Sequence, residues 1–220
     1  RGVQQVAANP SLLPARQAAI SSAQALVSRY QSIEARLTEI DEGVNAQITT
    51  TVDSINSYAQ QIANLNQRIV IAQAATSSPP NDLLDQRDQI VADLNKLVRV
   101  KTSANGDNSL NVFVGTGQSL VVGPRVNELR AVASSSDLTR MVVGMKVGNS
   151  VMELPEDLVT GGSLGGLLTF RSETLDRARN DLGRIAASMA LTFNAQNGLG
   201  QDLLGQITGD AAFESNFFQI

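Results

Sequence analysis

The sequence predicts a mainly α-helical protein with a small inserted antiparallel β subdomain (α+β), whose long helices pack side by side as a rod-like bundle. Three observations support this fold class. Apolar residues recur at helical spacing from Tyr30 to Ala72, apolar residues alternate in much of the region from Val98 to Val159, and a second helical stretch follows Gly161–Gly166. Apolar residues that return every three or four positions line one face of a helix, whereas alternation is typical of strands.

The first helix is expected to run from near Ser11 to around Ala74. Its apolar seam comprises Tyr30, Ile33, Leu37, Ile40, Val44, Ile48, Ile55, Tyr58, Ile62, Leu65, Ile69 and Ala72, with Thr51 as the one polar member. Two successive steps of four residues before Thr51 form a stutter, which locally unwinds a supercoil. Gly43 beside it weakens a helix by about 1 kcal/mol relative to alanine. No proline follows until Pro79, so the helix is expected to continue past Gly43.

A second, shorter helix is expected from about Asn81 to Val98, after a break at Thr76–Pro80, which contains two serines and two prolines. Asn81 or Asp82 is expected to cap its first turn. Its buried face is expected to comprise Leu83, Leu84, Val91, Leu94, Leu97 and Val98.

Short strands are expected between the second and third helices. The segments with strand-like patterns are 98–102, 110–114, 120–122, 128–132, 140–143 and 151–154. Turn-forming residues separate them at 104–108, 115–117, 134–136, 144 and 148–149. Because these connections are short, the strands are expected to form one small, mostly antiparallel sheet of hairpins.

A third long helix is expected to open at Gly161–Gly166 and to run to about Asn197. Its apolar seam comprises Leu167, Phe170, Leu175, Ala178, Leu182, Ile185, Met189 and Phe193. Met189 is interpreted as a flexible filler of that seam rather than as a metal ligand. The expected domains are a helical rod segment at 1–78, a short helix with the β subdomain at 79–162, a long helix packing back on the rod at 163–199, and the start of a truncated outer domain at 200–220.

The composition argues against several classes of function. A net charge of −4 and a pI near 4.9 argue against a general nucleic-acid binder, which needs a basic face. The chain has no cysteine and no histidine, which removes thiol chemistry and the commonest general base. No apolar run approaches the length of a membrane span, and no signal peptide is visible. The chain opens at Arg1, so it is expected to be a piece of a longer protein.

The glycines of Gly161–Gly166 allow two interpretations. The start of a helix attracts anions, so a phosphate site is one of them. No G-x-G-x-x-G pattern fits, however, and no Lys-Ser/Thr pair follows. A tight turn with close packing is therefore the favoured interpretation. The Gly115–Ser119 segment is interpreted in the same way, as a hairpin turn.

Two groups of carboxylates are candidates for a reactive or metal-binding site. Asp82, Asp85 and Asp88 share one helical face and suggest a hard cation, but Arg87 lies among them, which favours salt bridging and compensation of the helix dipole. Glu153, Glu156 and Asp157 resemble a carboxylate pair for glycoside hydrolysis, but neighbours in a loop rarely face each other. We therefore expect no catalytic, cofactor-binding or metal-binding residues.

Three motifs together resemble the flagellar hook-associated protein 1 family of hook–filament junction proteins. The motifs are Pro80–Gln89 continuing to Leu94–Leu97; Gly162–Ser172 followed by Leu175–Asp176, Ala178–Asn180 and Phe193–Gln196; and Ile55–Asn56 with Gln60–Asn66. The resemblance covers nearly the whole chain and identifies it as a central fragment that lacks both termini.

The resemblance implies an extracellular, non-enzymatic axial protein of the bacterial flagellum that is secreted by type III export. Its implied partners are copies of itself in a ring, the hook protein and the second hook–filament junction protein. An export chaperone engages a terminal segment in this family, so its site is expected to be absent from this chain. No nucleic acid and no membrane insertion are implied.

Two other classes of function remain as alternatives. A coiled-coil adaptor or connector of another secretion or fibre assembly would also explain the helical seam, though not the motifs around Asp85 and Gly165. An enzyme that uses carboxylates alone is the third class. The seam itself is expected to be partly an internal core and partly a surface covered by terminal helices that this chain lacks.

Overall fold

The computed structural model describes residues 2–76 and 79–219. Ser77 and Ser78, which belong to the expected break between the first two helices, lie outside the described residues, as do Arg1 and Ile220.

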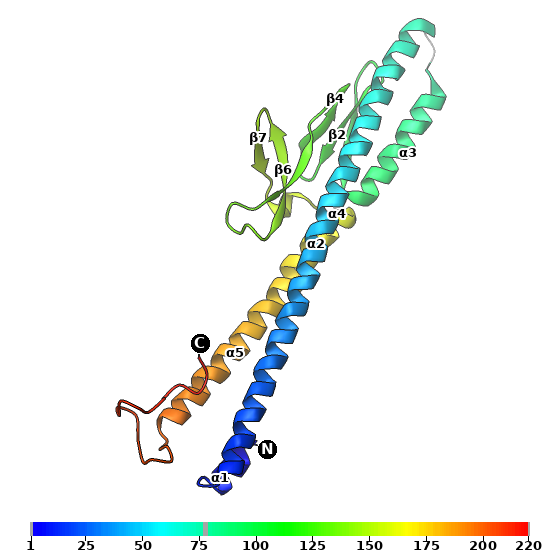
Figure 1. The fold of residues 1–220 in the computed structure, drawn as a ribbon. Coiled ribbons are helices and arrows are strands. Elements are labelled where there is room, and N and C mark those ends of the chain that lie inside the picture. The colour runs from blue at the N-terminus through cyan, green and yellow to red at the C-terminus, as the bar shows by residue number, and fades with distance from the viewer. Residues whose placement is uncertain (1, 77–78, 220) are drawn as a thin grey trace. The chain divides into compact units, whose positions relative to one another are not determined.

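Helices precede and follow the strands along the described chain (Figure 1). In order they are α1 (Gly2–Ala8), α2 (Leu13–Thr76) and α3 (Asn81–Leu97), and then, after the strands, the 3-10 turn η1 (Glu156–Leu158), α4 (Gly162–Phe170), the π-helical turn η2 (Arg171–Leu175) and α5 (Asp176–Gly198). The expected first helix is confirmed, and α2 continues through Gly43. The expected third helix is also confirmed, except that η2 interrupts its regular α-helical bonding.

The strands form two antiparallel sheets, so the prediction of one sheet is wrong. The first sheet has the order β1 (Val100–Ala104), β2 (Leu110–Val114), β3 (Gln118–Val122) and β4 (Arg125–Val126), and the second has the order β5 (Leu129–Ala133), β6 (Met141–Val147) and β7 (Ser150–Glu153). The division falls at Asn127 and Glu128. The Asn127 side-chain amide donates to the Ser119 carbonyl and its backbone N–H donates to the Leu120 carbonyl, so Asn127 is still bonded to β3, two residues before β5 begins.

The prediction for the α3 cap is also wrong. The cap position is Pro80, and no side chain caps the helix there. The Pro80 carbonyl accepts the N–H groups of Leu83 and Leu84 at 3.0 and 3.1 Å, so Asn81 already lies inside the first turn. The main elements nevertheless agree with the predicted class, a mainly helical chain with an inserted antiparallel β region.

The chain divides into two compact units. Unit 1 comprises the residues up to Ile40 and those from Thr174 onward, whereas unit 2 spans Asp41–Glu173. Helix α2 therefore contributes its first part to unit 1 and its remainder to unit 2.

Unit 2 contains one hydrophobic core, to which α2, α3, α4 and both sheets contribute. Fully buried members include Ile48, Val52, Ile55, Ile62, Leu94, Val98, Val112, Leu120, Leu129, Val143 and Leu164. The buried position after Ile48 is Val52, not Thr51 as predicted. The spacing from Val44 to Ile48 is four residues, and the same spacing follows from Ile48 to Val52. Burial of this apolar surface, at about 25 cal/mol per Å², is the main stabilising contribution to unit 2.

Unit 1 is built from α1, α5, the first part of α2 and the chain after α5. Arg179 of α5 lies against α2, with Nε 3.6 Å from Glu34 Oε1 and Nη2 donating to Thr38 Oγ1 at 3.1 Å. Residues 199–219 form turns and return to α5, where Phe217 and Phe218 pack on Phe193 with ring centroids 5.0–5.5 Å apart. Among the described residues of unit 1, only Leu175 and Ala190 are buried.

Candidate functional site

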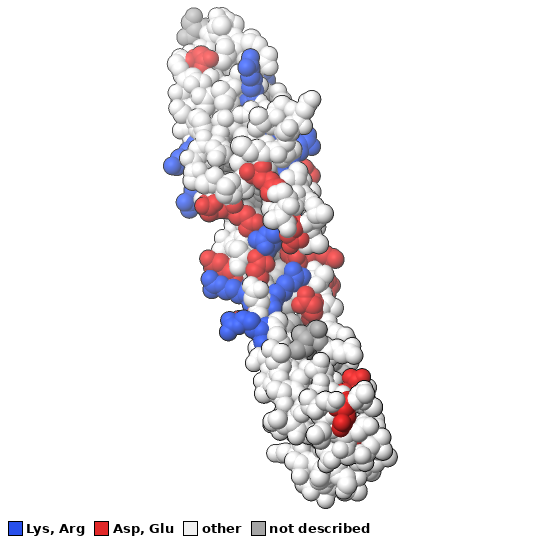
Figure 2. All heavy atoms as spheres, turned by 90° about the vertical axis from the view of Figure 1, so that its left-hand side faces the viewer, with Lys and Arg blue, Asp and Glu red and all other residues white. Residues whose placement is uncertain are grey.

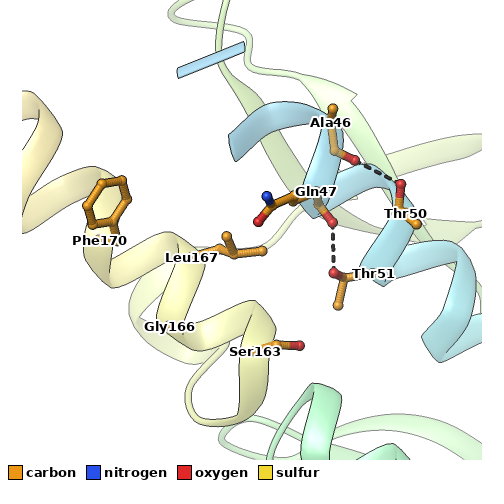
Figure 3. Close-up of a pocket in the computed structure, with 8 residues that line it drawn as sticks. All are labelled: Ala46, Gln47, Thr50, Thr51, Ser163, Gly166, Leu167 and Phe170. Atoms are coloured by element: carbon orange, nitrogen blue, oxygen red, sulfur yellow. Dashed lines mark hydrogen bonds between the residues drawn. The ribbon is translucent and has the colours of Figure 1, made fainter. Parts of the chain in front are cut away.

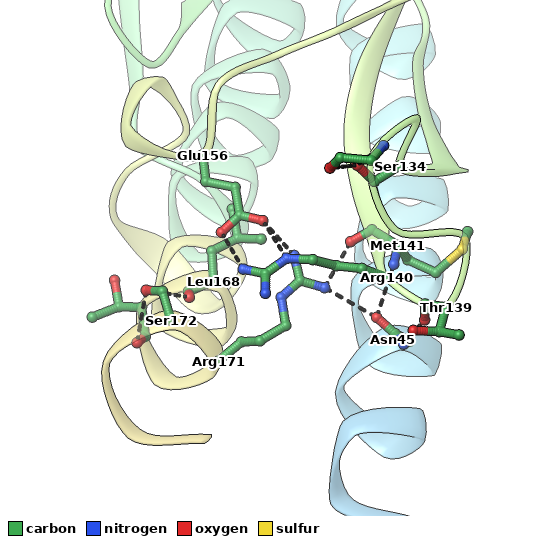
Figure 4. Close-up of polar contacts among 11 residues, drawn as sticks. Asn45, Ser134, Thr139, Arg140, Met141, Glu156, Leu168, Arg171 and Ser172 are labelled. Atoms are coloured by element: carbon green, nitrogen blue, oxygen red, sulfur yellow. Dashed lines mark hydrogen bonds and ion pairs between the residues drawn. The ribbon is translucent and has the colours of Figure 1, made fainter. Parts of the chain in front are cut away.

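A buried arginine joins four elements of unit 2 (Figure 4). The side chain of Arg171, the first residue of η2, is 0% exposed. Its Nη1 donates to Asn45 Oδ1 on α2 at 3.0 Å and to the Met141 carbonyl on β6 at 2.7 Å. Its Nη2 donates to Glu156 Oε1 on η1 at 2.7 Å. Because a buried charge is tolerated only when it is paired and hydrogen-bonded, these contacts fix the four elements together.

Glu156 is the shared acceptor of this group. Arg140 also donates to it, from Nε at 3.3 Å and from Nη2 at 3.2 Å, so two guanidinium groups approach one carboxylate. Asn45 completes the group, because it donates to the Thr139 carbonyl at 2.9 Å and accepts the Met141 N–H at 3.1 Å. We call Asn45, Arg140, Glu156 and Arg171 the arginine hub.

Glu153, Glu156 and Asp157, the candidates for glycoside hydrolysis, differ in their contacts and in their exposure. Glu156 belongs to the arginine hub, Glu153 Oε1 accepts the Ser135 N–H at 2.9 Å, and Asp157 is exposed. The contacts of Glu153 and Glu156 give both residues a structural role. The arrangement therefore favours the structural interpretation of these residues over the catalytic one.

A second buried arginine, Arg87, ties α3 to the β1–β2 hairpin. Its Nη1 donates to the Asn108 carbonyl at 2.6 Å, and Asn108, at a positive φ of 59°, donates its amide to Gln73 Oε1 at 2.8 Å. Asp88 Oδ1 lies 3.6 Å from Arg87 Nη2, which agrees with the salt-bridge interpretation. Asp82, Asp85 and Asp88 are exposed, and within residues 2–76 and 79–219 no acidic group of three is arranged to hold a metal ion.

Close packing requires glycine at Gly161, Gly162 and Gly165, as predicted, but not at Gly166, where a Cβ would meet no atom within 4 Å. Gly161 and Gly162 have φ values of 73° and 63°. A Cβ at Gly162 would lie 2.4 Å from the Leu97 carbonyl carbon, and one at Gly165 would lie 2.8 Å from that of Thr160. The hairpin interpretation of Gly115 is confirmed too, and a Cβ there would overlap the backbone of η1 at Leu158.

An open hollow of about 480 Å³ lies between α4 and α2 within unit 2 (Figure 3). It is lined by Ala46, Gln47, Thr50, Thr51, Ser163, Gly166, Leu167 and Phe170. The Thr50 and Thr51 hydroxyls donate to the Ala46 and Gln47 carbonyls, so the helix backbone already uses their protons. None of these eight residues is charged, and the hollow is better suited to surface contact than to chemistry.

Unit 1 exposes a row of apolar side chains along α2. The row comprises Leu13, Ile20, Val27, Ile33 and Ile40, which are 38–67% exposed. Leu13, Ile20 and Val27 are seven residues apart and lie along one side of the helix, whereas the step of six residues after Val27 places Ile33 and Ile40 about 120° further round it. We call this row the exposed seam. A groove on α5, which includes Ile185 and Met189 and is bordered by Val3 of α1, adds further apolar surface to unit 1. Exposed apolar surface of this kind is typical of an interaction site.

Charge on the molecule is mixed in sign. On the face shown in Figure 2, basic and acidic side chains are interspersed rather than segregated. Arg130 Nη2 donates to Glu128 at 2.6 Å, and this contact lowers the pKa of that carboxyl group. No helix in the described ranges is both long enough and apolar enough to cross a membrane.

Sequence reasoning missed the residues that hold unit 2 together. It did not single out Arg171 or Asn45, and it treated Arg87 only as a partner for neighbouring aspartates. One available signal was the position of Arg171 directly after the apolar run Leu164–Phe170, where a charged residue on a buried face requires a partner.

Comparison with known proteins gives consistent results. Residues 1–213 match the family described as "Flagellar hook-associated protein FlgK helical domain". Flagellar hook-associated protein 1 of Salmonella typhimurium is 45% identical over 195 residues, which cover 87% of this chain and 35% of that protein. The protein of the same name from Escherichia coli is 42% identical over 198 residues, covering 89% of this chain and 36% of that protein.

A solved structure agrees with these matches. The flagellar hook junction protein FlgK from Burkholderia pseudomallei has a TM-score of 0.85 and 43% identity, covering 94% of this chain and 37% of that one. The chain thus spans little more than a third of the length of these relatives.

Proposed function

This chain belongs to the family of flagellar hook-associated FlgK helical domains, and from that premise we propose that it is part of a structural protein at the junction between hook and filament of the bacterial flagellum. It acts by helix packing and subunit assembly, without catalysis. The observation that carries this proposal is the match along residues 1–213, supported by a 43% identical junction protein with the same fold.

The physical character of the two units supports an assembly role. Unit 2 has a closed core with internally paired arginines, as a rigid building block needs. Unit 1 carries the exposed seam, whose burial against other helices stabilises an assembly by about 25 cal/mol per Å² of apolar surface. We assign no catalytic, cofactor-binding or metal-binding residue.

The proposed partners are copies of the same protein in a ring, the hook protein and the second hook–filament junction protein. An export chaperone is the remaining proposed partner and binds the full-length protein. The protein is secreted by type III export and functions outside the cell, with no nucleic acid partner and no membrane insertion. The division into domains at 1–78, 79–162, 163–199 and 200–220 is part of the same proposal.

Deletion of the gene tests the proposal directly. Cells that lack the protein are expected to build hooks to which filaments fail to attach, as seen by electron microscopy of isolated flagella. Normal filaments in the deletion strain would reject the junction role and favour an adaptor of another assembly.

Complementation with the full-length protein tests the role of the exposed seam. The variant Ile20→Gln/Val27→Gln/Ile33→Gln is expected to be secreted but to restore few filaments. The matched control is Leu138→Gln, which also replaces an exposed apolar residue but lies in unit 2. Equal restoration by both variants would show that the seam is not the assembly surface.

A further inference from the structure

Three asparagines of α2 bind the backbone of the two sheets through their side-chain amides. Asn56 donates to the Leu129 carbonyl at 2.8 Å and accepts the Leu129 N–H at 2.9 Å. Asn66 donates to the carbonyls of Leu110 and Gly123, both at 2.7 Å, and accepts the Leu110 N–H at 3.0 Å. Asn45 makes the corresponding pair of bonds to the Thr139 carbonyl and the Met141 N–H.

The positions of these residues on α2 are regular. Asn45, Asn56 and Asn66 are eleven and ten residues apart. At 3.6 residues per turn they lie within about 80° of arc, and at 1.5 Å per residue they extend over roughly 30 Å of helix. We call them the amide ladder. Asn66 binds the first sheet, whereas Asn45 and Asn56 bind the second.

Each amide occupies the place of a neighbouring strand. A carboxamide carries one acceptor and one donor group, like the peptide group of a strand. Leu129 begins β5, an edge strand, and its side away from β6 faces Asn56 instead of another strand. Asn66 has no exposed surface, so each bond that it loses would leave a buried polar group unsatisfied.

Directional bonds resist a motion that apolar contacts permit. The core of unit 2 packs α2 against the sheets through aliphatic side chains, and hydrophobic attraction is not directional. A hydrogen bond, by contrast, weakens steeply with distance and angle. Sliding a strand by one residue moves its backbone by about 3.3 Å, which breaks both bonds of an amide at once.

We propose that the amide ladder locks the axial register of both sheets on α2. The sheets then cannot slide along the helix without losing the paired bonds at Asn45, Asn56 and Asn66 together. This inference concerns how the β region is held and goes beyond the junction role, so its test needs no flagellar partner.

The test measures hydrogen exchange and distances in single variants of the 220-residue chain. Asn56→Leu and Asn66→Leu keep the number and branching of the side-chain heavy atoms but remove every side-chain hydrogen bond. Asn56→Asp keeps the acceptor and loses the donor, and its half-buried position makes it the milder change. The matched controls are Asn64→Leu and Asn64→Asp, at an exposed asparagine of the same helix.

Spin labels report the register directly. The chain has no cysteine, so introduced pairs at Gln61 and Lys101, or at Gln61 and Ser150, are its only thiols. These positions are exposed. The distance from Gln61 to Lys101 reports the position of the first sheet on α2, and the distance from Gln61 to Ser150 reports that of the second sheet.

Each variant should affect the amide that the asparagine binds. Asn56→Leu should speed hydrogen exchange of the Leu129 N–H about tenfold or more and broaden the distribution of distances between labels at Gln61 and Ser150. Asn66→Leu should speed exchange of the Leu110 N–H by a similar factor and broaden the distribution of distances between labels at Gln61 and Lys101. Asn56→Asp should give a smaller change in the same direction. The Asn64 variants should match the parent protein. Unchanged exchange and unchanged distances in both leucine variants would overturn the proposal, because apolar packing would then set the register alone.

Discussion

Units 1 and 2 share the helix α2 and carry the same kind of apolar repeat, but they use it differently. In unit 2 the side chains of Ile48, Ile55 and Ile62 are fully buried. In unit 1, Ile20 and Ile33 leave about two-fifths of their surface exposed. The difference lies in what surrounds the helix, because two sheets, α3 and α4 all pack in unit 2, whereas unit 1 has α1, α5 and the returning chain.

The two units differ in their polar contacts as clearly as in their apolar ones. Both arginines that are buried among the described residues, Arg87 and Arg171, belong to unit 2 and bind main-chain carbonyls. The corresponding contact in unit 1, between Arg179 and Glu34, is partly exposed. A helical repeat therefore indicates a surface that needs a partner, but not whether that partner lies in the same chain.

Of the predicted changes, Arg171→Met should lower the free energy of unfolding the most. Removing one member of a buried ion pair costs about 3–5 kcal/mol, and the loss of Arg171 takes a hydrogen-bond donor from both Glu156 and the Met141 carbonyl. Arg184→Met, which removes an exposed pair with Asp181 in unit 1, should cost about 0–1 kcal/mol. Urea-induced unfolding followed by circular dichroism measures both. Equal losses would show that the arginine hub does not stabilise unit 2.

The apolar repeat can be compared in the two units with one matched substitution. Ile62→Ala should cost about 2–5 kcal/mol, because it leaves a cavity in a closed core. Ile33→Ala should cost less than about 1 kcal/mol, because the side chain is already exposed in the free chain. The same unfolding measurement applies. A large loss at Ile33 would mean that unit 1 buries its seam in solution, for example between two copies of the chain.

Gly43→Ala should stabilise the protein. Gly43 lies inside α2, close to the boundary between the units, and a Cβ there meets no atom within 4 Å. Alanine in a helix interior is favoured over glycine by about 0.5–1 kcal/mol. Gly162→Ala is the contrasting control and should be destabilising, because φ is 63° and the Leu97 backbone lies in the way. Destabilisation by Gly43→Ala would show that α2 needs its flexibility there.

Lowering the pH should cause the smallest predicted loss of stability, through the Asp107 carboxylate in unit 2. The Asp107 carboxylate accepts the Ser109 hydroxyl and N–H at 2.6 and 2.9 Å, and these bonds lower its pKa from the ordinary value of 3.8. The folded state therefore binds fewer protons than the unfolded state. The stabilisation is present above the unfolded pKa and is lost as the pH falls through the lower, folded pKa.

Asp107→Asn should accordingly flatten the dependence of unfolding free energy on pH between about pH 5 and pH 2. Asp53→Asn, at an exposed position of α2, is the control. The measurement is urea unfolding at a series of pH values. If the pH dependence of the unfolding free energy is unchanged in Asp107→Asn, the β1–β2 turn does not contribute to the loss of stability in acid.

The sequence was sufficient to predict the elements but not their burial. Periodicity located α2, α3 and β2 almost to the residue, because it depends on neighbours along the chain. The arginine hub was not predictable in this way, since Arg171 reaches Asn45 across 126 residues and Met141 across 30. The division into two sheets was missed because local alternation does not reveal which strands pair, and contacts such as that between Asn56 and Leu129 join residues 73 apart.

Asn56 has a further consequence for how the protein behaves in a crowded solution. The open side of an edge strand presents free N–H and C=O groups, to which an extended segment of another molecule can add and begin an aggregate. At the start of β5 both groups of Leu129 are already occupied by the Asn56 carboxamide. A helix side chain thus shields a sheet edge from intermolecular strand addition, and replacing it should make the protein more prone to form fibrils on storage.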